Sequence, residues 1–360
     1  MKPSDIVKRR LAGQHLIKPT LRTATEVVSM LGAVQAQDYT GAKWALAQRT
    51  VDATDETIEQ EIASGAIVRT HILRPTWHFV AAADIRWMLE LSAPRVNVMC
   101  GYMYREMELD DAVFRKSRAA LIKALEGGKQ LTRVELARVL GRARISVEDP
   151  VRVAHLMIRA ELDGIVCSGA RRGKQFTYGL LEERAPQARS LDRDEALAEL
   201  TKRYFSTRGP ATIDDFCWWS GLTKADAKRG VQAAAGELEH TTSEDRACYF
   251  APMRLPAQPA TPIAHLLPNY DEYFIGLKDR NAMLNRLTTA GIDPKIDALS
   301  GHILTINGQV VGRWRRTLTK KEAIVSLHLL TSPTQAERRT IEKSTRRFGR
   351  FLGLVARAAA

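Results

Sequence analysis

The sequence predicts a mainly helical α+β protein with three tandem winged helix-turn-helix units, followed by a small C-terminal β-barrel and a basic helix. Three observations lead to this prediction. A Thr-x-x-acid motif recurs three times before an apolar helical stretch. A segment of strand–turn–strand character follows each helical group. The last hundred residues then change to alternating strand patterns and end in one amphipathic, basic helix.

The Thr-x-x-acid motif is typical of a helix start, because Thr and the acid satisfy backbone N–H groups that have no partner in the first turn. The three copies are Thr23-x-x-Glu26, Thr132-x-x-Glu135 and Thr212-x-x-Asp215. The third is weaker, since Asp replaces Glu. Another helical segment precedes each copy, at 4–11, 117–125 and 194–204. Any helical protein contains capped helices, so the prediction rests on the repeated order.

The hairpin candidates complete that order. They lie at 66–80, 164–179 and 238–250. Helix, capped helix, helix and hairpin is the order of a winged helix-turn-helix unit. We therefore expect units at 1–115, 116–190 and 191–255, and a C-terminal segment of sheet or barrel and helix at 256–360.

The second hairpin has the clearest turn, "GARRGKQF", which places Arg171, Arg172 and Lys174 around Gly173. Glycine allows the backbone conformations that tight turns require. Basic side chains at such a tip can reach phosphates or enter a minor groove. The alternative is an exposed turn that carries charge only because it is solvated.

The C-terminal segment follows a Pro-rich link at 251–262. The run "HILTINGQVVGRWRRTL" (302–318) alternates around Asn307-Gly308, which predicts a hairpin. A further strand is expected at 323–330. These strands predict a small sheet or barrel.

A final helix is expected at about 334–355. Ile341, Phe348, Leu352 and Val355 fall on one stripe at helical spacing, which indicates a face packed on a core. The opposite side carries Arg339, Lys343, Arg346, Arg347 and Arg350. The helix should therefore dock by its apolar stripe and present a basic ridge.

Charge is unevenly distributed. The net charge is +13, and residues 301–360 carry twelve Lys and Arg against three acids. This segment also includes Arg313, Arg315 and Arg316. A concentrated positive field favours a polyanion, nucleic acid before anionic membrane. A solvated basic face that only aids solubility is the alternative.

Composition and motifs exclude several classes. The chain has no apolar run of about 18 residues, and its N-terminus lacks the apolar core of a secretory signal, so we expect a cytoplasmic, nucleoid-associated protein. The four cysteines lie 31 or more residues apart, which argues against zinc ribbons and iron–sulfur clusters. We find no P-loop, Rossmann or Gly-x-Ser-x-Gly motif and expect no cofactor and no metal.

The strings "VQAQD", "RTHILRPTWHFV", "LLPNYDEYFIGLKDR" and "VGRWRR" together resemble the AlkZ/YcaQ family of bacterial winged-helix DNA glycosylases. The resemblance covers almost the whole chain. It implies three tandem winged helices and a C-terminal β-barrel wrapped around duplex DNA. It also implies DNA repair by monofunctional excision of alkylated purines, with unhooking of interstrand crosslinks in some members.

The family's catalytic signature is Gln, an apolar residue, then Gln or Asp, and it matches Gln35, Ala36 and Gln37. A cationic alkylated purine leaves without being protonated, so the site needs a placed water and an electron-rich oxygen rather than a general acid. A Gln carbonyl can serve both needs. The resemblance implies that Gln37 aligns the water and Gln35 holds its other side or contacts the sugar. By spacing alone, two solvated amides after a helix remain the alternative.

Other residues have two interpretations each. Asp271 is either a supporting carboxylate of the site or the cap of a local turn. Arg74 and His78, on one phase of the first hairpin, could reach DNA, whereas Trp77 and Phe79 on the other phase should pack in the core. Trp218 and Trp219 are expected to pack; base stacking would require one exposed ring.

The expected partner is double-stranded DNA, bound by a monomer without an obligate protein partner. The main rival function is a non-catalytic winged-helix DNA-binding protein or transcription regulator. Such regulators are usually dimers that read two half-sites, and they have no use for amides aimed at a sugar. A protein-interaction scaffold is a third possibility, against which the basic C-terminal segment argues.

Overall fold

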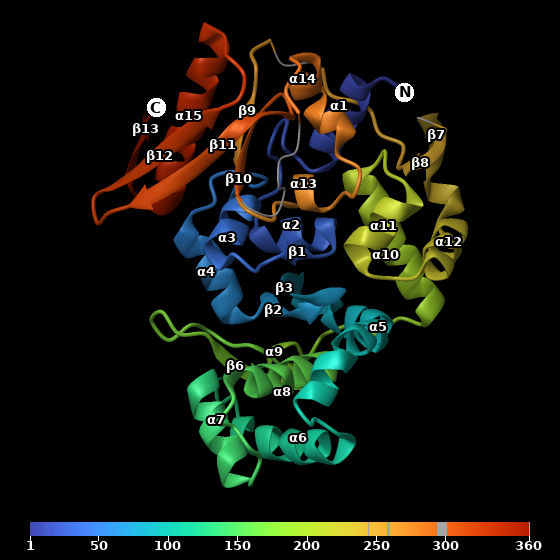
Figure 1. The fold of residues 1–360 in the computed structure, drawn as a ribbon, viewed down its shortest axis with the longest axis vertical. Helices are drawn as coiled ribbons and strands as arrows, with labels where there is room; N and C mark the ends of the chain where they lie inside the picture. The colour runs from blue at the N-terminus through green and yellow to red at the C-terminus, as the bar shows by residue number, and fades with distance from the viewer. Residues whose placement is uncertain (244, 258–259, 294–300, 360) are drawn as a thin grey trace. The chain divides into compact units, whose positions relative to one another are not determined.

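The computed structural model describes residues 1–243, 245–257, 260–293 and 301–359. The chain divides into two compact units (Figure 1). Unit 1 comprises Met1–Ile58, Ala198–Trp219 and the described residues of Thr223–Ala360; unit 2 comprises Glu59–Leu197 and Ser220–Leu222. The segment boundaries expected at 115, 190 and 255 stay a prediction.

The N-terminal segment is helical, as expected. Its elements are α1 (Pro3–Gly13), α2 (Ala24–Leu31), β1 (Val34–Gln35), α3 (Tyr39–Ala47) and α4 (Asp55–Ser64). The capping box forms: Thr23 Oγ1 accepts from the Glu26 amide at 3.1 Å, and the Glu26 carboxylate accepts from the Thr23 amide at 3.0 Å. This cap fixes where α2 begins, and α2 leads directly into the segment that carries the glutamine pair.

The first predicted hairpin is confirmed within unit 2. It consists of β2 (Ile67–Ile72) and β3 (Arg74–Ala81), which pair antiparallel with Arg69 opposite Phe79 and His71 opposite Trp77. After η1 (Ala82–Asp84), α5 (Ile85–Glu106) follows the hairpin.

The remaining elements of unit 2 follow the order expected for 116–190. They are α6 (Asp111–Leu125), β4 (Leu131–Thr132), α7 (Arg133–Arg142), α8 (Pro150–Leu162), β5 (Val166–Ser168), β6 (Thr177–Leu180) and α9 (Leu181–Arg184). The second capping box forms between Thr132 and Glu135. Leu121, Leu136, Leu140 and Leu156 are fully buried in one core between these helices. The number of winged units in the chain stays a prediction.

The third group comprises α10 (Arg193–Arg208), α11 (Ile213–Ser220), α12 (Lys224–Ala233), η2 (Ala235–Glu237), β7 (Glu239–Ser243) and β8 (Arg246–Phe250). Thr212 and Asp215 exchange the bonds of a capping box despite the shorter acid, with Thr212 N to Asp215 Oδ2 at 2.8 Å. The strands β7 and β8 pair as the expected hairpin. Its residue 244, and residues 258–259 of the Pro-rich link, lie outside the described residues.

The C-terminal segment forms a five-stranded sheet in the order β13-β12-β11-β10-β9. Its elements are β9 (Ala264–Leu267), α13 (Glu272–Ile275), α14 (Asn281–Thr289), β10 (His302–Ile306), β11 (Gln309–Leu318), β12 (Glu322–Leu329), α15 (Gln335–Leu352) and β13 (Val355–Ala359). The predicted hairpin is confirmed, since β10 and β11 pair around Asn307 and Gly308, both at positive φ. Closure into a barrel stays a prediction.

The final helix ends earlier than the sequence predicted. Gly353 adopts a left-handed conformation (φ 66°), and the Leu354 amide bonds back to the Gly349 carbonyl at 2.9 Å, which closes α15 at Leu352. Val355 is therefore wrong as a member of the apolar stripe: it begins β13, is 75% exposed, and pairs parallel with β12. Figure 1 shows α15 lying along the sheet in unit 1, where Ile341, Phe348 and Phe351 are buried.

Within the described ranges, no helix combines the length and the apolar character that a membrane crossing requires.

Candidate active site and DNA-contacting surfaces

The glutamine segment, residues 31–38, joins α2 to α3 in unit 1. Gly32 turns the chain at φ 80°, β1 carries Gln35, and Asp38 caps α3 by accepting from the Gly41 amide at 3.0 Å. Gln35 is buried, with 6% of its surface exposed, whereas Gln37 is exposed. The two amides therefore lie at different depths, and Gln37 is the one exposed to solvent.

Glu272 binds the backbone of this segment, a role that was not predicted from the sequence. Its Oε1 accepts from the Gln35 backbone amide at 2.9 Å, and its Oε2 accepts from Arg208 Nη2 at 2.6 Å and from Trp219 Nε1 at 2.9 Å. Glu272 is fully buried. The sequence offered one signal, an acidic pair inside the apolar run "LLPNYDEYFIG", but its partners are 53 to 237 residues away.

Asp271 forms a second buried ion pair beside the first. Its carboxylate accepts from Arg49 Nη2 at 2.7 Å and from Nη1 at 3.0 Å, a bidentate arrangement. It also accepts from the Tyr273 amide at 2.9 Å and caps α13, which confirms the turn-cap interpretation. A supporting role for Asp271 in the reaction stays a prediction.

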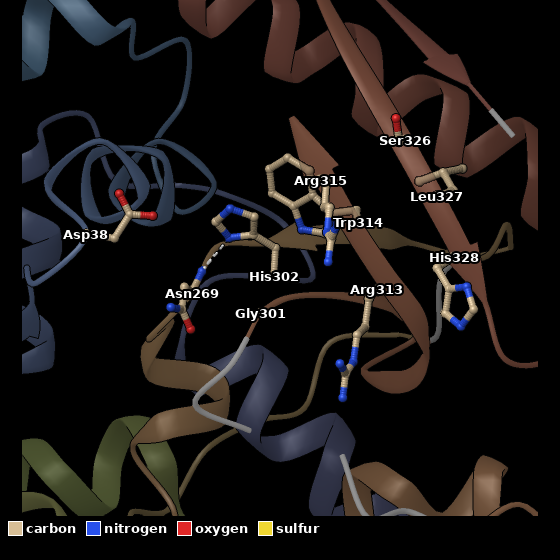
Figure 2. Close-up of a pocket in the computed structure, with 10 residues that line it drawn as sticks. All are labelled: Asp38, Asn269, Gly301, His302, Arg313, Trp314, Arg315, Ser326, Leu327 and His328. Carbon is tan, nitrogen blue, oxygen red and sulfur yellow. Dashed lines mark hydrogen bonds between the residues drawn. The ribbon is translucent and has the colours of Figure 1, made fainter. Parts of the chain in front are cut away.

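A cavity of about 780 Å³ in unit 1 lies next to the glutamine segment, since Asp38 is one of its lining residues. Figure 2 shows the Asp38 carboxylate on one side of this cavity and Arg313, Arg315 and His328 of the sheet on the other. Arg316 binds Asp38, with Nη2 3.3 Å from both carboxylate oxygens. Of the three predicted arginines of β11, Arg316 thus orders Asp38, and Arg313 and Arg315 face the cavity.

His302 lines the same cavity and is neutral. Its Nδ1 accepts from the Asn269 amide at 2.7 Å (Figure 2). A neutral ring that accepts at Nδ1 carries its proton on Nε2. Burial, with the nearby Arg316 charge as the second cause, lowers the pKa of His302 to about 4. The ring stacks on Trp314 at 4.7 Å and 29°. The cavity therefore combines fixed positive charge with a neutral ring that donates from Nε2.

The basic residues predicted on α15, which we call the α15 ridge (Arg339, Lys343, Arg346, Arg347 and Arg350), lie in different surroundings. Arg339, Lys343 and Arg350 are exposed and line a groove of about 480 Å³, which also borders residues 16–19 and 261–265. Arg346 is exposed but lies outside the groove. Arg347 is partly buried and donates to the Ala47 and Thr50 carbonyls at 2.8 and 3.1 Å. Burial lowers the pKa of Arg347, which mainly ties α15 to the end of α3.

In unit 2, the wing tip (residues 169–176) carries the three predicted cations in different settings. Arg172 bonds Glu135 Oε1 and the Gln130 carbonyl, both at 2.8 Å. Arg171 lies 3.8 Å from Glu59 and over the Phe176 ring. Lys174 is exposed beside Gly173, where no atom lies within 4 Å of an added Cβ. Arg172 and Lys174 are thus the two exposed cations of the tip, whereas Arg171 is partly buried.

The first hairpin separates its two candidates. Arg74 is half-buried, whereas His78 is fully buried and its Nδ1 lies 2.9 Å from the Thr76 carbonyl, which argues against a direct phosphate contact by His78. Phe79 is a core residue as expected, but Trp77 is only half-buried. The guanidinium of Arg69 lies over the Trp77 and Phe176 rings at 4.1 and 4.7 Å, a cation–aromatic stack that the sequence did not reveal.

Trp218 and Trp219 were expected to pack, with base stacking possible only if one of the two rings is exposed. Trp219 is fully buried and donates to Glu272, whereas Trp218 is 39% exposed and donates to the Ile275 carbonyl at 3.2 Å. One ring is thus available for stacking.

Across the part of the chain that the structure describes, no group of three or more His, Cys, Asp or Glu side chains is arranged to hold a metal ion. His71 of the first hairpin bonds Glu161.

Capped helices followed by hairpins, together with arginines that line a cavity, are features that fit a nucleic-acid-binding class of protein. Comparison with known protein families identifies the family. The model of the family described as DNA glycosylase AlkZ-like matches residues 28–351, so the chain belongs to the AlkZ-like DNA glycosylase family. This confirms the resemblance and the enzyme class, and it decides against a non-catalytic regulator.

A sequence comparison and a structure comparison, both with Streptomyces sahachiroi AlkZ, agree with this assignment. The chain is 25% identical over 338 residues to a Streptomyces sahachiroi protein named interstrand DNA cross-link repair glycosylase, and the match covers 88% of each chain. Among solved structures it is similar to the Streptomyces sahachiroi DNA glycosylase AlkZ, with a TM-score of 0.79 and 22% identity over the full length of both chains. The structural likeness shows a common fold.

Proposed function

We propose that this enzyme repairs DNA by hydrolysing the N-glycosidic bond of alkylated purines in the duplex, with Gln37 and Gln35 positioning the attacking water. The family assignment supports the glycosylase reaction. The observation that carries the residue assignment is the setting of the pair. The exposed Gln37 immediately precedes Asp38, which lines the cavity with Arg313 and Arg315.

The chemistry suits amides. A purine alkylated at N7 or N3 is cationic, so when the C1′–N9 bond breaks the base takes the bonding electrons and leaves neutral. Positive charge develops on the sugar. A Gln carbonyl oxygen stabilises this charge and accepts a hydrogen bond from the water that attacks C1′, while the water's proton passes to solvent. Orientation of this kind contributes several kcal/mol to catalysis, on the order of 10²-fold or more in rate.

The cavity beside Asp38 also supports a larger substrate. Its volume of about 780 Å³ is in the range of drug-sized binding sites and exceeds what a methylated base requires. The Streptomyces sahachiroi relative is named for repair of interstrand cross-links. We propose that this chain also releases bulky or crosslinked purine adducts.

The cationic surfaces supply duplex binding in this proposal. Arg313 and Arg315 at the cavity, the exposed ridge residues Arg339, Lys343 and Arg350 that line the α15 groove, and Lys174 at the wing tip would contact backbone phosphates. The neutral His302 would add a hydrogen-bond donor without changing its charge near neutral pH.

The test is release of free base. Duplex DNA with a single N7-methylguanine, and a second duplex with an N7-linked interstrand crosslink, are incubated with the enzyme, and free base and unhooked strands are quantified by mass spectrometry. We expect abasic sites without strand scission and no release from undamaged duplex. Absence of release from both lesions would reject alkylated purines as the substrate class.

A further inference from the structure

The buried Arg208–Glu272 pair contacts the glutamine segment at three points. Arg208 Nη1 donates to the Leu31 carbonyl at 3.0 Å and Nη2 reaches the Ala33 carbonyl at 3.4 Å. Glu272 Oε1 accepts from the Gln35 amide at 2.9 Å. The contacted residues alternate along the chain. A single ion pair therefore binds the same side of the backbone from Leu31 to Gln35.

We propose that Arg208 and Glu272 are positioning residues: they clamp the backbone of residues 31–35 and so set where Gln35 and Gln37 stand. This inference rests on the proposed function of the two glutamines. Neither residue is placed to touch the substrate, because both side chains are fully buried.

Neighbouring residues fix the positions of Arg208 and Glu272. Arg208 and Glu272 meet at 2.6 Å, the guanidinium lies 4.3 Å from the Trp219 ring centre, and Trp219 Nε1 donates to Glu272. At Gly276, an added Cβ would come within 2.7 Å of Arg208 Nε, so glycine leaves room for the guanidinium. A buried ion pair is weak evidence for stability, because desolvation offsets the attraction. A geometric role accounts better for such a pair beneath an active segment.

The neighbouring ion pair provides an internal comparison. Arg49 and Asp271 are equally buried, but Arg49 bonds the Ala45 carbonyl and Gln14 Oε1, at 2.8 and 2.6 Å. None of these contacts falls within residues 31–38. The two pairs therefore share burial and charge and differ in whether they hold the glutamine segment.

The experiment removes each pair as a whole, which avoids leaving one buried charge alone. In Arg208→Met/Glu272→Met the clamp is removed. In the control, Arg49→Met/Asp271→Asn, Asn retains the cap of α13. We expect single-turnover base release at saturating enzyme to fall roughly 10- to 100-fold in the first variant, the effect of misplacing a reacting group by about 1 Å. The control serves the exchange measurement described next, since Asp271 is itself a candidate residue of the site, and duplex affinity should change in neither variant.

Amide hydrogen exchange of residues 31–38 gives a second readout that needs no substrate. Exchange in this segment should rise about tenfold or more in the clamp variant and stay at the wild-type level in the control. Unchanged exchange in the clamp variant, an equal rise of exchange in both variants, or a wild-type rate of base release in the clamp variant would overturn the clamp. If wild-type enzyme releases no base but exchange rises only in the clamp variant, the substrate proposal fails and the clamp stands. Should the double Met variant not fold, Glu272→Gln carries both readouts, and Asp271→Asn is its control for hydrogen exchange.

Discussion

The glutamine segment of unit 1 and the wing tip of unit 2 are both polar turns, yet they are built differently. The first is held by one fully buried ion pair, Arg208–Glu272, and has one buried amide, Gln35. The second is exposed from Arg172 to Phe176, and its ion pair, Arg172–Glu135, is more than a third open to solvent. A fixed backbone suits a reaction that depends on angstrom-level placement, whereas an exposed turn can adapt to a phosphate backbone.

This difference implies a division of labour. Changes in the glutamine segment should act on the chemical step and leave binding intact. Changes at the wing tip or on the α15 ridge should act on duplex affinity and its salt dependence.

The largest effect is expected for Gln37→Ala. Loss of the carbonyl that orients water should lower single-turnover release of N7-methylguanine by roughly 10²-fold or more, the scale of removing one electrostatic interaction with the transition state. Duplex affinity, measured by fluorescence anisotropy, should change little. Gln335→Ala, at the exposed start of α15, is the control for loss of an amide. Wild-type turnover by Gln37→Ala would remove the catalytic assignment.

A smaller effect is expected on the α15 ridge. Arg339→Ala/Lys343→Ala removes two cations from the groove, whereas Arg338→Ala/Arg346→Ala removes two exposed cations of the same helix that do not line it. If the groove holds phosphates, the first variant should bind duplex roughly tenfold more weakly, and its log–log salt slope should become shallower by about 0.9 for each phosphate that is no longer neutralised. The second should remain close to wild type. Equal weakening in both would mean that only the overall field of α15 matters.

The wing tip should contribute less. Replacing Arg171, Arg172 and Lys174 by Ala should weaken binding to damaged and undamaged duplex alike by a few-fold and flatten the salt slope, with single-turnover release unchanged. Arg172 also bonds Glu135, which caps α7, so Lys174→Ala is the cleaner single variant and Lys123→Ala on α6 its control. Unchanged affinity and slope in the triple variant would show that the tip is only a solvated turn.

Local chemistry made much of the fold predictable. Capping boxes fixed the starts of α2 and α7, and Asn307-Gly308 fixed the β10–β11 hairpin, because these signals act over three or four residues. The end of α15 was misjudged because apolar spacing continued past Gly353, whose left-handed conformation ends the helix. The parallel pairing of β13 with β12 was not foreseen, since it joins segments on either side of that helix.

The site was predictable only in part. The Gln-x-Gln motif drew attention to residues 35–37, but nothing local indicated that Glu272 would bond the Gln35 amide or that Arg208 would reach Leu31, 177 residues away. The sequence gives the number of basic side chains, but it does not show which of them bind other residues of the protein and which remain exposed. Arg316 binds Asp38 and Arg347 binds helix carbonyls, whereas Arg315 and Lys343 remain exposed. Contacts between distant segments decide such roles.

The smallest expected effect concerns pH and is confined to unit 1. Burial lowers the pKa of His302 to about 4, from 6.5 for an ordinary histidine. Between these values the unfolded chain binds more protons than the folded one at this position, so stability should be complete above about pH 6.5 and decline as pH falls toward 4. His265, with a pKa also lowered to about 4, adds to the same decline, so the contribution of His302 has to be measured as the difference between the wild type and a variant that lacks it.

His302→Phe keeps a ring for stacking on Trp314 but cannot be protonated. We therefore expect the melting temperature to drop by less between pH 7 and pH 5 in this variant than in the wild type, as followed by circular dichroism. The wing tip contains no histidine, so Lys174→Ala should show the full wild-type drop. Equal drops for wild type and His302→Phe would mean that His302 does not titrate with folding, and the neutral donor assigned to the cavity would lose its basis.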